Sequence, residues 1–206
     1  MKKNKILLIG AGGHAQSCID VIEVTGIYTV HGMVGTMKEK GNIRYGYKII
    51  GNDEDLTWIA ELVPNALIAV GQIKDSNIRE YLYKLALNLG FKLPPIISRY
   101  AYVSNSSIIG QGTIVMHGAI VNANAMIDEN CIINNRALIE HGVHVCENTH
   151  ISTGVIINGD ATIGKGTFIG SGAVIKEGVV VGENCIIPMG AKVKCDVSDN
   201  IHYKDS

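Results

Sequence analysis

A repeat of six residues constrains the fold more than any other feature of this 206-residue sequence. From Val103 to Val193 every sixth residue is Val or Ile, at sixteen positions without exception. Four residues after each of the first fifteen comes a small side chain, with Val the largest. A period of six is neither the 3.6 of a helix nor the 2 of a single strand. It predicts short strands separated by tight corners, each strand with one aliphatic residue facing inward.

Three such strands close a triangular coil, and successive coils stack about 4.8 Å apart at β spacing. Sixteen steps make a little over five coils. We therefore predict a parallel β-helix over residues 98–198, followed by a C-terminal tail over 199–206. The pattern is specific for fold and says little about activity, so an inert structural solenoid remains an alternative.

The composition limits the class of protein. Hydrophobic residues make up 47% of the chain but aromatics only 5%, which suits narrow, regular packing by small aliphatic side chains. The net charge of −1 and pI of about 6.6 give no sign of a nucleic-acid partner. No apolar stretch reaches the roughly 18 residues that a membrane span needs. The five cysteines show no CxxC spacing, which argues against a disulfide framework or zinc cluster and favours the cytoplasm.

Residues 1–97 lie before the six-residue series and are predicted to form a separate α/β domain. Strands and helices alternate there, which favours a small parallel, Rossmann-like sheet. Pro94-Pro95 marks the passage into the solenoid. The expected strands are 5–9, 28–34 and 66–70, and the expected helices are 15–25, 53–62 and 76–89.

A glycine turn, Gly10-x-Gly12-Gly13, joins the first strand to the first helix. Backbone N–H groups of such a turn, at a helix N-terminus, can cradle a phosphate. A tight turn without any ligand is the alternative. NAD is disfavoured, because Val34-Gly35-Thr36 stands where an acidic residue would hold the ribose. We expect a nucleotide-linked ligand other than NAD.

Three histidines lie close together in "RALIEHGVHVCENTH", residues 136–150. His144 and His150 directly precede inward aliphatic residues, so both are expected to point outward, and His141 is expected at or near a corner. One coil after His141 comes Gly159, which leaves open space and an accessible backbone N–H. A base beside an unhindered donor suits acyl transfer. A merely solvated corner histidine is the alternative.

These features together resemble the sugar O- and N-acetyltransferases of the sialic acid and bacillosamine type. The resemblance covers nearly the whole chain: the strand, the turn Gly10–His14, "AVG" at Ala69–Gly71, and hexapeptides containing the step from Asn134 to His141. It implies a left-handed β-helix that binds acetyl-CoA as cosubstrate, with no metal. It also implies an N-terminal domain that binds a sugar or nucleotide-sugar, and a homotrimer with active sites between subunits.

The resemblance also implies roles for particular residues. His141 matches the general base, with Asn134 near it; His150 matches a histidine close to the thioester and Gly159 a donor to the acetyl carbonyl. Small residues on the later coils leave a groove for pantetheine. The expected acetyl-CoA contacts beyond His150 and Gly159 are Ser171, Gly172, Met189 and Gly190, and the expected sugar-nucleotide contacts are Gly12, Gly13, His14, Gly35, Thr36 and Gly71.

Two positions depart from the pattern that the resemblance implies. An acidic residue usually follows the base, but Gly142 stands there, so Glu140 or Glu147 is a candidate replacement. Gly35-Thr36 occupies the place of an acidic pair after the second strand, which leaves the identity of the base in the nucleotide open. We predict N-acetylation of a nucleotide-linked amino sugar by direct transfer, with Glu140 assisting His141.

Three alternatives remain from the sequence. One is O-acetylation of a sialic-acid-type sugar. Another is a zinc enzyme like the γ-class carbonic anhydrases, with ligands drawn from His117, His141, His144 and His150. The third is a nucleotide-sugar-binding or scaffold protein without catalysis, which Gly142 favours.

Overall fold

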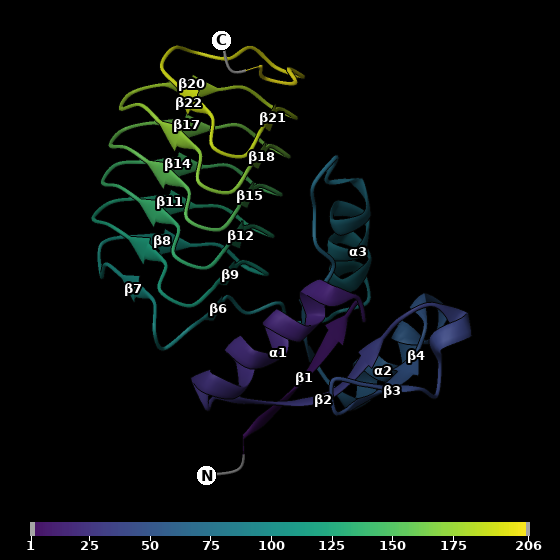
Figure 1. The fold of residues 1–206 in the computed structure, drawn as a ribbon. Helices are drawn as coiled ribbons and strands as arrows, with labels where there is room; N and C mark the ends of the chain where they lie inside the picture. Colours follow the sequence, from purple (N-terminus) through teal and green to yellow (C-terminus); the bar gives the residue numbers. More distant parts are fainter. Residues whose placement is uncertain (1–2, 205–206) are drawn as a thin grey trace.

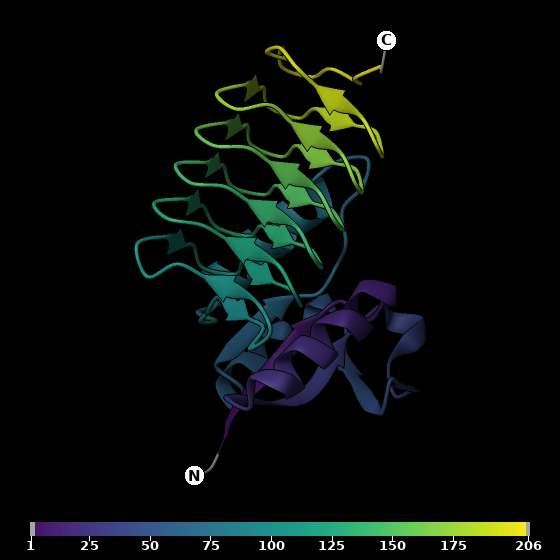
Figure 2. The ribbon, with the colours of Figure 1, turned by 60° about the vertical axis from the view of Figure 1, so that its left-hand side comes forward.

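The chain folds into an α/β domain followed by a stack of triangular coils, as Figure 1 shows. The structure is a computed structural model that describes residues 3–204. In Figure 2 the coils rise above the α/β domain, so one end of the stack adjoins that domain. Within the described residues, no helix is long and apolar enough to cross a membrane.

The N-terminal domain has a five-stranded sheet in the order β3-β4-β2-β1-β5. The interior strand β1 is buried on both faces: Ile6 and Leu8 pack with α1, whereas Leu7 and Ile9 pack with α2 and α3. The elements are β1 (Asn4–Ile9), α1 (Gly13–Thr25), β2 (Tyr28–Val34), β3 (Ile43–Arg44), β4 (Tyr47–Gly51), α2 (Leu56–Leu62), β5 (Asn65–Ile68) and α3 (Asn77–Asn88), with short 3-10 turns at Met37–Glu39 and Asp53–Asp55.

All the predicted strands and helices of this domain are present, and their ends differ from the predicted ones by at most three residues. The hairpin of β3 and β4 was not predicted. Its two-residue turn, Tyr45-Gly46, has positive φ at both positions (52° and 81°). That is the backbone of a hairpin turn whose twist matches the strands, and Gly46, between Tyr45 and Tyr47, was its only sequence signal.

The second part is a left-handed parallel β-helix whose two-residue strands form three sheets. We name them sheet A (β6, β9, β12, β15, β18, β21), sheet B (β7, β10, β13, β16, β19, β22) and sheet C (β8, β11, β14, β17, β20). The strands are β6 (Ile96–Ile97), β7 (Tyr102–Val103), β8 (Ile108–Ile109), β9 (Ile114–Val115), β10 (Ile120–Val121), β11 (Met126–Ile127), β12 (Ile132–Ile133), β13 (Leu138–Ile139), β14 (His144–Val145), β15 (His150–Ile151), β16 (Ile156–Ile157), β17 (Thr162–Ile163), β18 (Phe168–Ile169), β19 (Val174–Ile175), β20 (Val180–Val181), β21 (Ile186–Ile187) and β22 (Lys192–Val193).

The predicted inward register is confirmed. From Val115 to Val193 every aliphatic residue of the six-residue series is at most 1% exposed, and together they form one continuous core. The ladder begins one step earlier than Val103, because Ile96–Ile97 already pairs with β9. Residues after 198 also join the stack: Tyr203 N donates to Ile186 O and packs against the core.

The corners carry a second six-residue pattern. Fourteen residues in steps of six, from Gly112 to Gly190, have φ between 52° and 74°. All are Gly or Asn except Arg136 and Asp160. Gly and Asn adopt this left-handed conformation at least cost, so the corners select residue type as strictly as the core does. We name the corners AB, BC and CA after the sheets that they connect.

A seam between the two domains runs along sheet A. The outward side chains of Ile96, Ile114 and Ile132 are buried in one cluster with α1. Above them Arg79, only 1% exposed, ties both parts together. Its guanidinium donates to Val70 O at the end of β5 (2.7 Å) and to Oδ1 of Asn130 at a CA corner (2.8 Å).

His150 lies at the outward position next to Ile132 in sheet A, yet it is only 7% exposed. The prediction that it points away from the β-helix core holds, but the segment around Gln72 covers it. Its Nδ1 lies 2.6 Å from Gln72 O and must carry the proton, because a carbonyl only accepts. Burial, with the charge of Arg79 as a smaller cause, lowers the pKa of His150 to about 4; burial and the same charge lower the pKa of His14 to about 3.

These two neutral imidazoles should make the fold sensitive to acid. The unfolded chain would protonate both near pH 6.5, whereas the folded chain resists until about pH 4 or 3, so stability falls as pH falls below 6.5. At pH 5 the loss is about 2 kcal/mol for each imidazole. We expect His150→Gln to reduce the drop in thermal midpoint between pH 7 and pH 5, and the exposed-site control His202→Gln to leave it unchanged. Equal drops in wild type and His150→Gln would contradict this origin.

Candidate functional site

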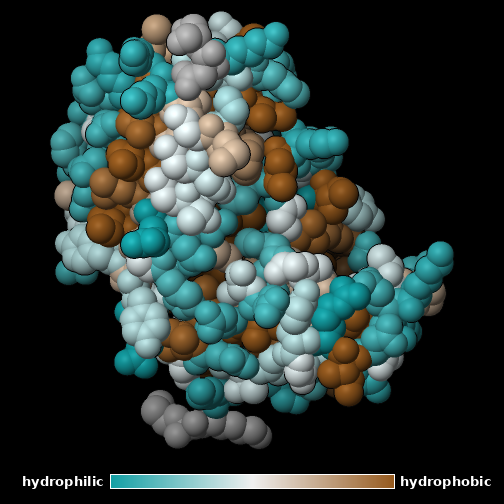
Figure 3. Space-filling view, viewed as in Figure 1, coloured by the Kyte–Doolittle hydropathy of each residue, from teal (hydrophilic) through white to brown (hydrophobic). Residues whose placement is uncertain are grey.

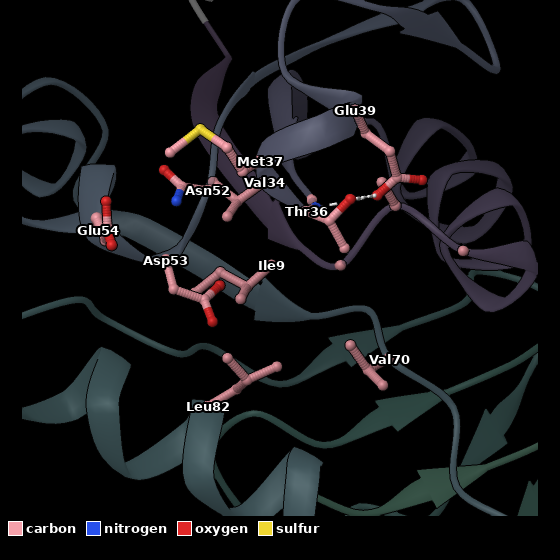
Figure 4. Close-up of a pocket in the computed structure, with 14 residues that line it drawn as sticks. Ile9, Val34, Thr36, Met37, Glu39, Asn52, Asp53, Glu54, Val70 and Leu82 are labelled. Atoms are coloured by element: carbon pink, nitrogen blue, oxygen red, sulfur yellow. Dashed lines mark hydrogen bonds between the residues drawn. The ribbon is translucent and has the colours of Figure 1, made fainter.

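A pocket of about 490 Å³ opens where β1 and β2 end and α1 begins. Figure 4 shows Asp53 and Glu54 at one end of it and the Thr36–Glu39 pair at the other. Of the predicted substrate contacts, Gly12, Gly35 and Thr36 line this pocket. The other residues that line the pocket, most of which were not predicted from the sequence, are Ile9, Gly10, Ala11, Val34, Met37, Glu39, Asn52, Asp53, Glu54, Val70 and Leu82.

The glycines at the pocket have different structural reasons. A Cβ at Gly10 would lie 2.7 Å from the Val70 side chain, and its φ is 119°, so both packing and backbone conformation favour glycine there. A Cβ at Gly12 or Gly13 would meet nothing within 4 Å. Neither residue has a φ that favours glycine. Their missing side chains therefore leave space at the start of α1, whose first turn holds no acidic residue and whose free N–H groups suit an anion.

The carboxylate nearest the end of β2 is already engaged. Glu39 accepts hydrogen bonds from the Thr36 N–H (2.9 Å) and hydroxyl (2.8 Å) and pairs with Arg44 (2.9 Å). The Thr36 hydrogen bonds, more than the Arg44 charge, hold the pKa of Glu39 below its usual range. Asp53 and Glu54, by contrast, make no ion pair among the described residues and face the pocket. They are the acidic groups available to a ligand there.

His14, Gly71 and His150 form a group where the N-terminal domain meets sheet A. A Cβ at Gly71 would lie 3.5 Å from the His14 Cβ. The Nε2 atom of His14 is buried without a hydrogen-bond partner in the described chain. Asn134 Nδ2 lies 3.3 Å from Nε2 of His150, which accepts because Nδ1 holds the proton. Asn134 thus contacts His150, and it lies one sheet away from His141.

His141 occupies a BC corner, exposed, with its ring directly over Gly159. A Cβ at Gly159 would lie 2.8 Å from Nδ1 and 3.0 Å from Nε2, so only glycine admits the imidazole. The predicted proximity is therefore present, although the ring fills the space that was expected to stay open. Neither ring nitrogen of His141, nor the Gly159 N–H, has a hydrogen-bond partner within residues 3–204. Glu140 lies beside them, and its carboxylate accepts from the His141 backbone N–H at 3.3 Å.

The residues expected to hold acetyl-CoA gather at the AB corners. A Cβ at Gly172 or Gly190 would meet nothing within 4 Å, and Met189 is 81% exposed. Ser171 Oγ lies 2.9 Å from Ser152 Oγ. Other glycines of these coils serve the backbone: a side chain at Gly164 or Gly170 would strike the main chain of the next coil. Open glycines therefore lie at the AB corner that also carries Asn134, as Gly154, Gly172 and Gly190, and at one BC corner, as Gly178.

The four histidines of the zinc hypothesis do not converge in one subunit. His117 bonds Ser98 and Asp20 at the seam, and His144 bonds Asp128 on sheet C (3.0 Å). Among residues 3–204, one group of potential ligands has its atoms within 4.8 Å: Asp128, His144 and Cys146. Burial, and then the charges of Asp128 and nearby glutamates, raises the pKa of the Cys146 thiol to about 11, which disfavours the thiolate that a metal would need.

The sequence and the fold match known proteins along nearly the whole chain. Residues 5–85 match the family described as PglD N-terminal domain. Residues 125–158 match the hexapeptide repeat of succinyl-transferase, and residues 160–195 match the bacterial transferase hexapeptide. A search of curated protein sequences gave no significant match.

Two solved structures are similar in both sequence and fold. One is the acetyltransferase domain of PglB from Neisseria gonorrhoeae in complex with acetyl coenzyme A, with 32% identity, coverage of 96% of this chain and 94% of that one, and a TM-score of 0.87. The other is PerB from Caulobacter crescentus in complex with CoA and GDP-perosamine, with 29% identity, coverage of 96% and 92%, and a TM-score of 0.90. The chain therefore belongs to the hexapeptide-repeat sugar acetyltransferases that carry a PglD-type N-terminal domain.

Proposed function

We propose that the protein transfers the acetyl group of acetyl-CoA to an amine on a nucleotide-linked sugar. The observation that carries the proposal is the exposed imidazole of His141, seated on Gly159 with both ring nitrogens unbonded in the described chain. A pocket with an open glycine turn at a helix N-terminus suits the phosphates of the acceptor. The PerB structure contains GDP-perosamine and CoA, and the PglB domain contains acetyl-CoA, which favours an amino sugar over a sialic-acid-type hydroxyl.

The active protein in this proposal is a homotrimer. His141 and Gly159 lie at BC corners, whereas Asn134, His150, Gly172 and Gly190 lie at or beside AB corners, so one subunit separates the two halves of the site. Both kinds of corner border sheet B. If sheet B faces a threefold axis, the BC corner of one subunit meets the AB corner of the next.

The outward face of sheet B supports this arrangement. Ile120 and Ile156 are 39% and 37% exposed, and Leu138 and Val174 between and beside them are half-buried. Figure 3 shows hydrophobic surface gathered in a column over the β-helix. Apolar residues repeated on a flat face favour association.

The chemistry follows from the residues at the two corners. His141 accepts the proton of the attacking amine as the tetrahedral centre forms, and the Gly159 N–H donates to the developing oxyanion. Asn134 lies at the AB corner and His150 beside it in sheet A, on the side proposed for the thioester. His150 stays neutral at physiological pH because its pKa is about 4. The transfer is direct, because the BC corner at His141 carries no Ser or Cys as a nucleophile. We place this activity in the cytoplasm, in keeping with five cysteines that show no CxxC spacing.

Replacement of the base tests the mechanism. We expect His141→Ala to lower kcat by about 10²–10⁴-fold, with little change in KM for acetyl-CoA, because the base acts only in the transition state. Thiol release from acetyl-CoA with a panel of amino-sugar nucleotides measures both constants. His144→Ala, three residues away but on sheet C, is the control. Near-wild-type turnover of His141→Ala would exclude this mechanism, and a wild type inactive on the whole panel would favour a binding protein.

A larger residue at the open AB corner tests where the donor binds. Gly172 has φ 69°, so Gly172→Asn keeps the backbone while it fills the space. We expect weaker CoA binding and unchanged nucleotide-sugar binding in calorimetric titrations. Gly26→Asn, at an equally open glycine with φ 71° in the N-terminal domain, is the control. Equal loss of both ligands would contradict separate sites for donor and acceptor.

A charge on sheet B tests the assembly. We expect Ile156→Asp to dissociate the trimer, because it would bury a carboxylate against apolar neighbours, and to lower activity with it. Ile108→Asp, at an exposed position on sheet C (62% exposed), should leave both unchanged. Light scattering after gel filtration gives the mass. A wild type with the mass of one subunit would refute the trimer and the shared site.

A further inference from the structure

The base needs a partner that holds its ring. A histidine that acts as a general base is usually oriented by a third group, which bonds one ring nitrogen and fixes the proton there so that the other nitrogen is free to react. In the described chain neither ring nitrogen of His141 has such a bond. The next residue, Gly142, has no side chain to provide one.

A carboxylate from the next coil stands where a side chain of residue 142 would begin. A Cβ added at Gly142 would overlap Oδ1 of Asp160. The Asp160 N–H donates to His141 O at 2.9 Å, and the residue before it, Gly159, lies under the His141 ring. The main chain of Asp160 is thus held next to the imidazole: its own N–H bonds His141 O, and the preceding residue lies under the ring. The glycine at 142 is what makes room for its carboxylate.

The backbone does not require an acidic residue at 160. Twelve of the fourteen left-handed corner positions are Gly or Asn, and Asp160 has the same φ (59°) as Asn124 two coils earlier. The Asp160 carboxylate makes no hydrogen bond or ion pair within residues 3–204. Neither the backbone conformation nor a partner explains the charge of Asp160. Its carboxylate lies beside the proposed base and is free to bond the His141 ring.

The other nearby carboxylates face or pair with other groups. Glu140 faces the backbone N–H of His141, Glu147 lies at a CA corner and pairs with Lys165 at 3.2 Å, and Glu177 lies one coil beyond Gly159 beside Lys176 (4.0 Å). Glu147 can therefore be set aside as the replacement for an acidic residue at 142.

We propose that Asp160 is the positioning residue of His141: its carboxylate accepts the N–H of one ring nitrogen and leaves the other to take the proton of the acceptor. This inference rests on the proposed acetyl transfer. A single acidic residue directly after the base would play the same part. Here Gly142 leaves the space, and Asp160 on the adjacent coil supplies the carboxylate.

Asp160→Asn separates this role from a structural one. Asn suits a left-handed corner at least as well as Asp, so a merely structural Asp160 predicts unchanged kinetics. We expect kcat to fall at least about tenfold with KM for acetyl-CoA nearly unchanged. We also expect the acidic limb of the kcat profile to move about one unit lower, because a carboxylate favours the imidazolium. Glu140, Lys176 and Glu177 also face this corner, so Glu140→Gln is the matched control and should shift the limb less. A larger shift for Glu140→Gln would assign the role to Glu140.

A reciprocal exchange tests the geometry. Asp160→Gly should lower kcat as Asp160→Asn does, and adding Gly142→Asp to it should restore most of the loss, because the carboxylate then returns from the adjacent coil. Asn124→Gly controls for an added glycine at a BC corner. Failure of the double variant to recover any activity, with its trimer and CoA binding intact, would contradict the inference.

A titration that needs no turnover distinguishes this inference from the proposed function. The Cε1–H resonance of His141, identified by its loss in His141→Ala, should titrate at a lower pH in Asp160→Asn than in wild type. If that shift appears while no acceptor is acetylated, the pairing stands and the proposed function fails. If acetylation is efficient and the resonance does not move, the pairing is wrong.

Discussion

The structure depends on the stacking of one backbone conformation every six residues. Each step has an aliphatic side chain in the core and a left-handed residue at the corner, and each coil bonds to the next through main-chain groups, as Gly142 N to Ala123 O. Because main-chain contacts set the rise, a side chain at a given position lies beside its counterpart one coil away. For this reason the ring of His141 lies over Gly159 on the next coil, and the Asp160 carboxylate occupies the space that a side chain at Gly142 would fill.

The seam fixes the second half of the molecule relative to the first. Buried Arg79 spans it with no carboxylate partner among residues 3–204, and bonds carbonyl oxygens on one side and Asn130 on the other. Burial, and then the charge of Arg79, lowers the pKa of His14 and His150 and keeps both neutral, so one set of contacts holds the domains together and sets the protonation of the histidine beside the proposed donor site. The same burial makes the seam the place where acid weakens the fold.

The proposed site is divided between two kinds of corner, and this division explains why a single subunit looks incomplete. His141 is exposed with unbonded nitrogens, while the open glycines Gly172 and Gly190 lie one sheet away. The sheet between them presents Ile120 and Ile156 to its surroundings. The proposed threefold assembly accounts for both the apolar exposure and the divided site, because each interface in it joins the base of one subunit to the donor groove of the next.

The sequence by itself determined the β-helix, its register, and the corner address of His141 opposite Gly159, because all three follow from a strict period. The corner glycines and asparagines follow the same period, because the left-handed backbone at each corner selects them. The same period already separates Asn134, at an AB corner, from His141, at a BC corner. Only the tertiary structure decided that His150 is buried and that Asp53 and Glu54 line the pocket. Those facts arise where Gln72 covers sheet A and where β4 meets β2, contacts between segments that no local period encodes.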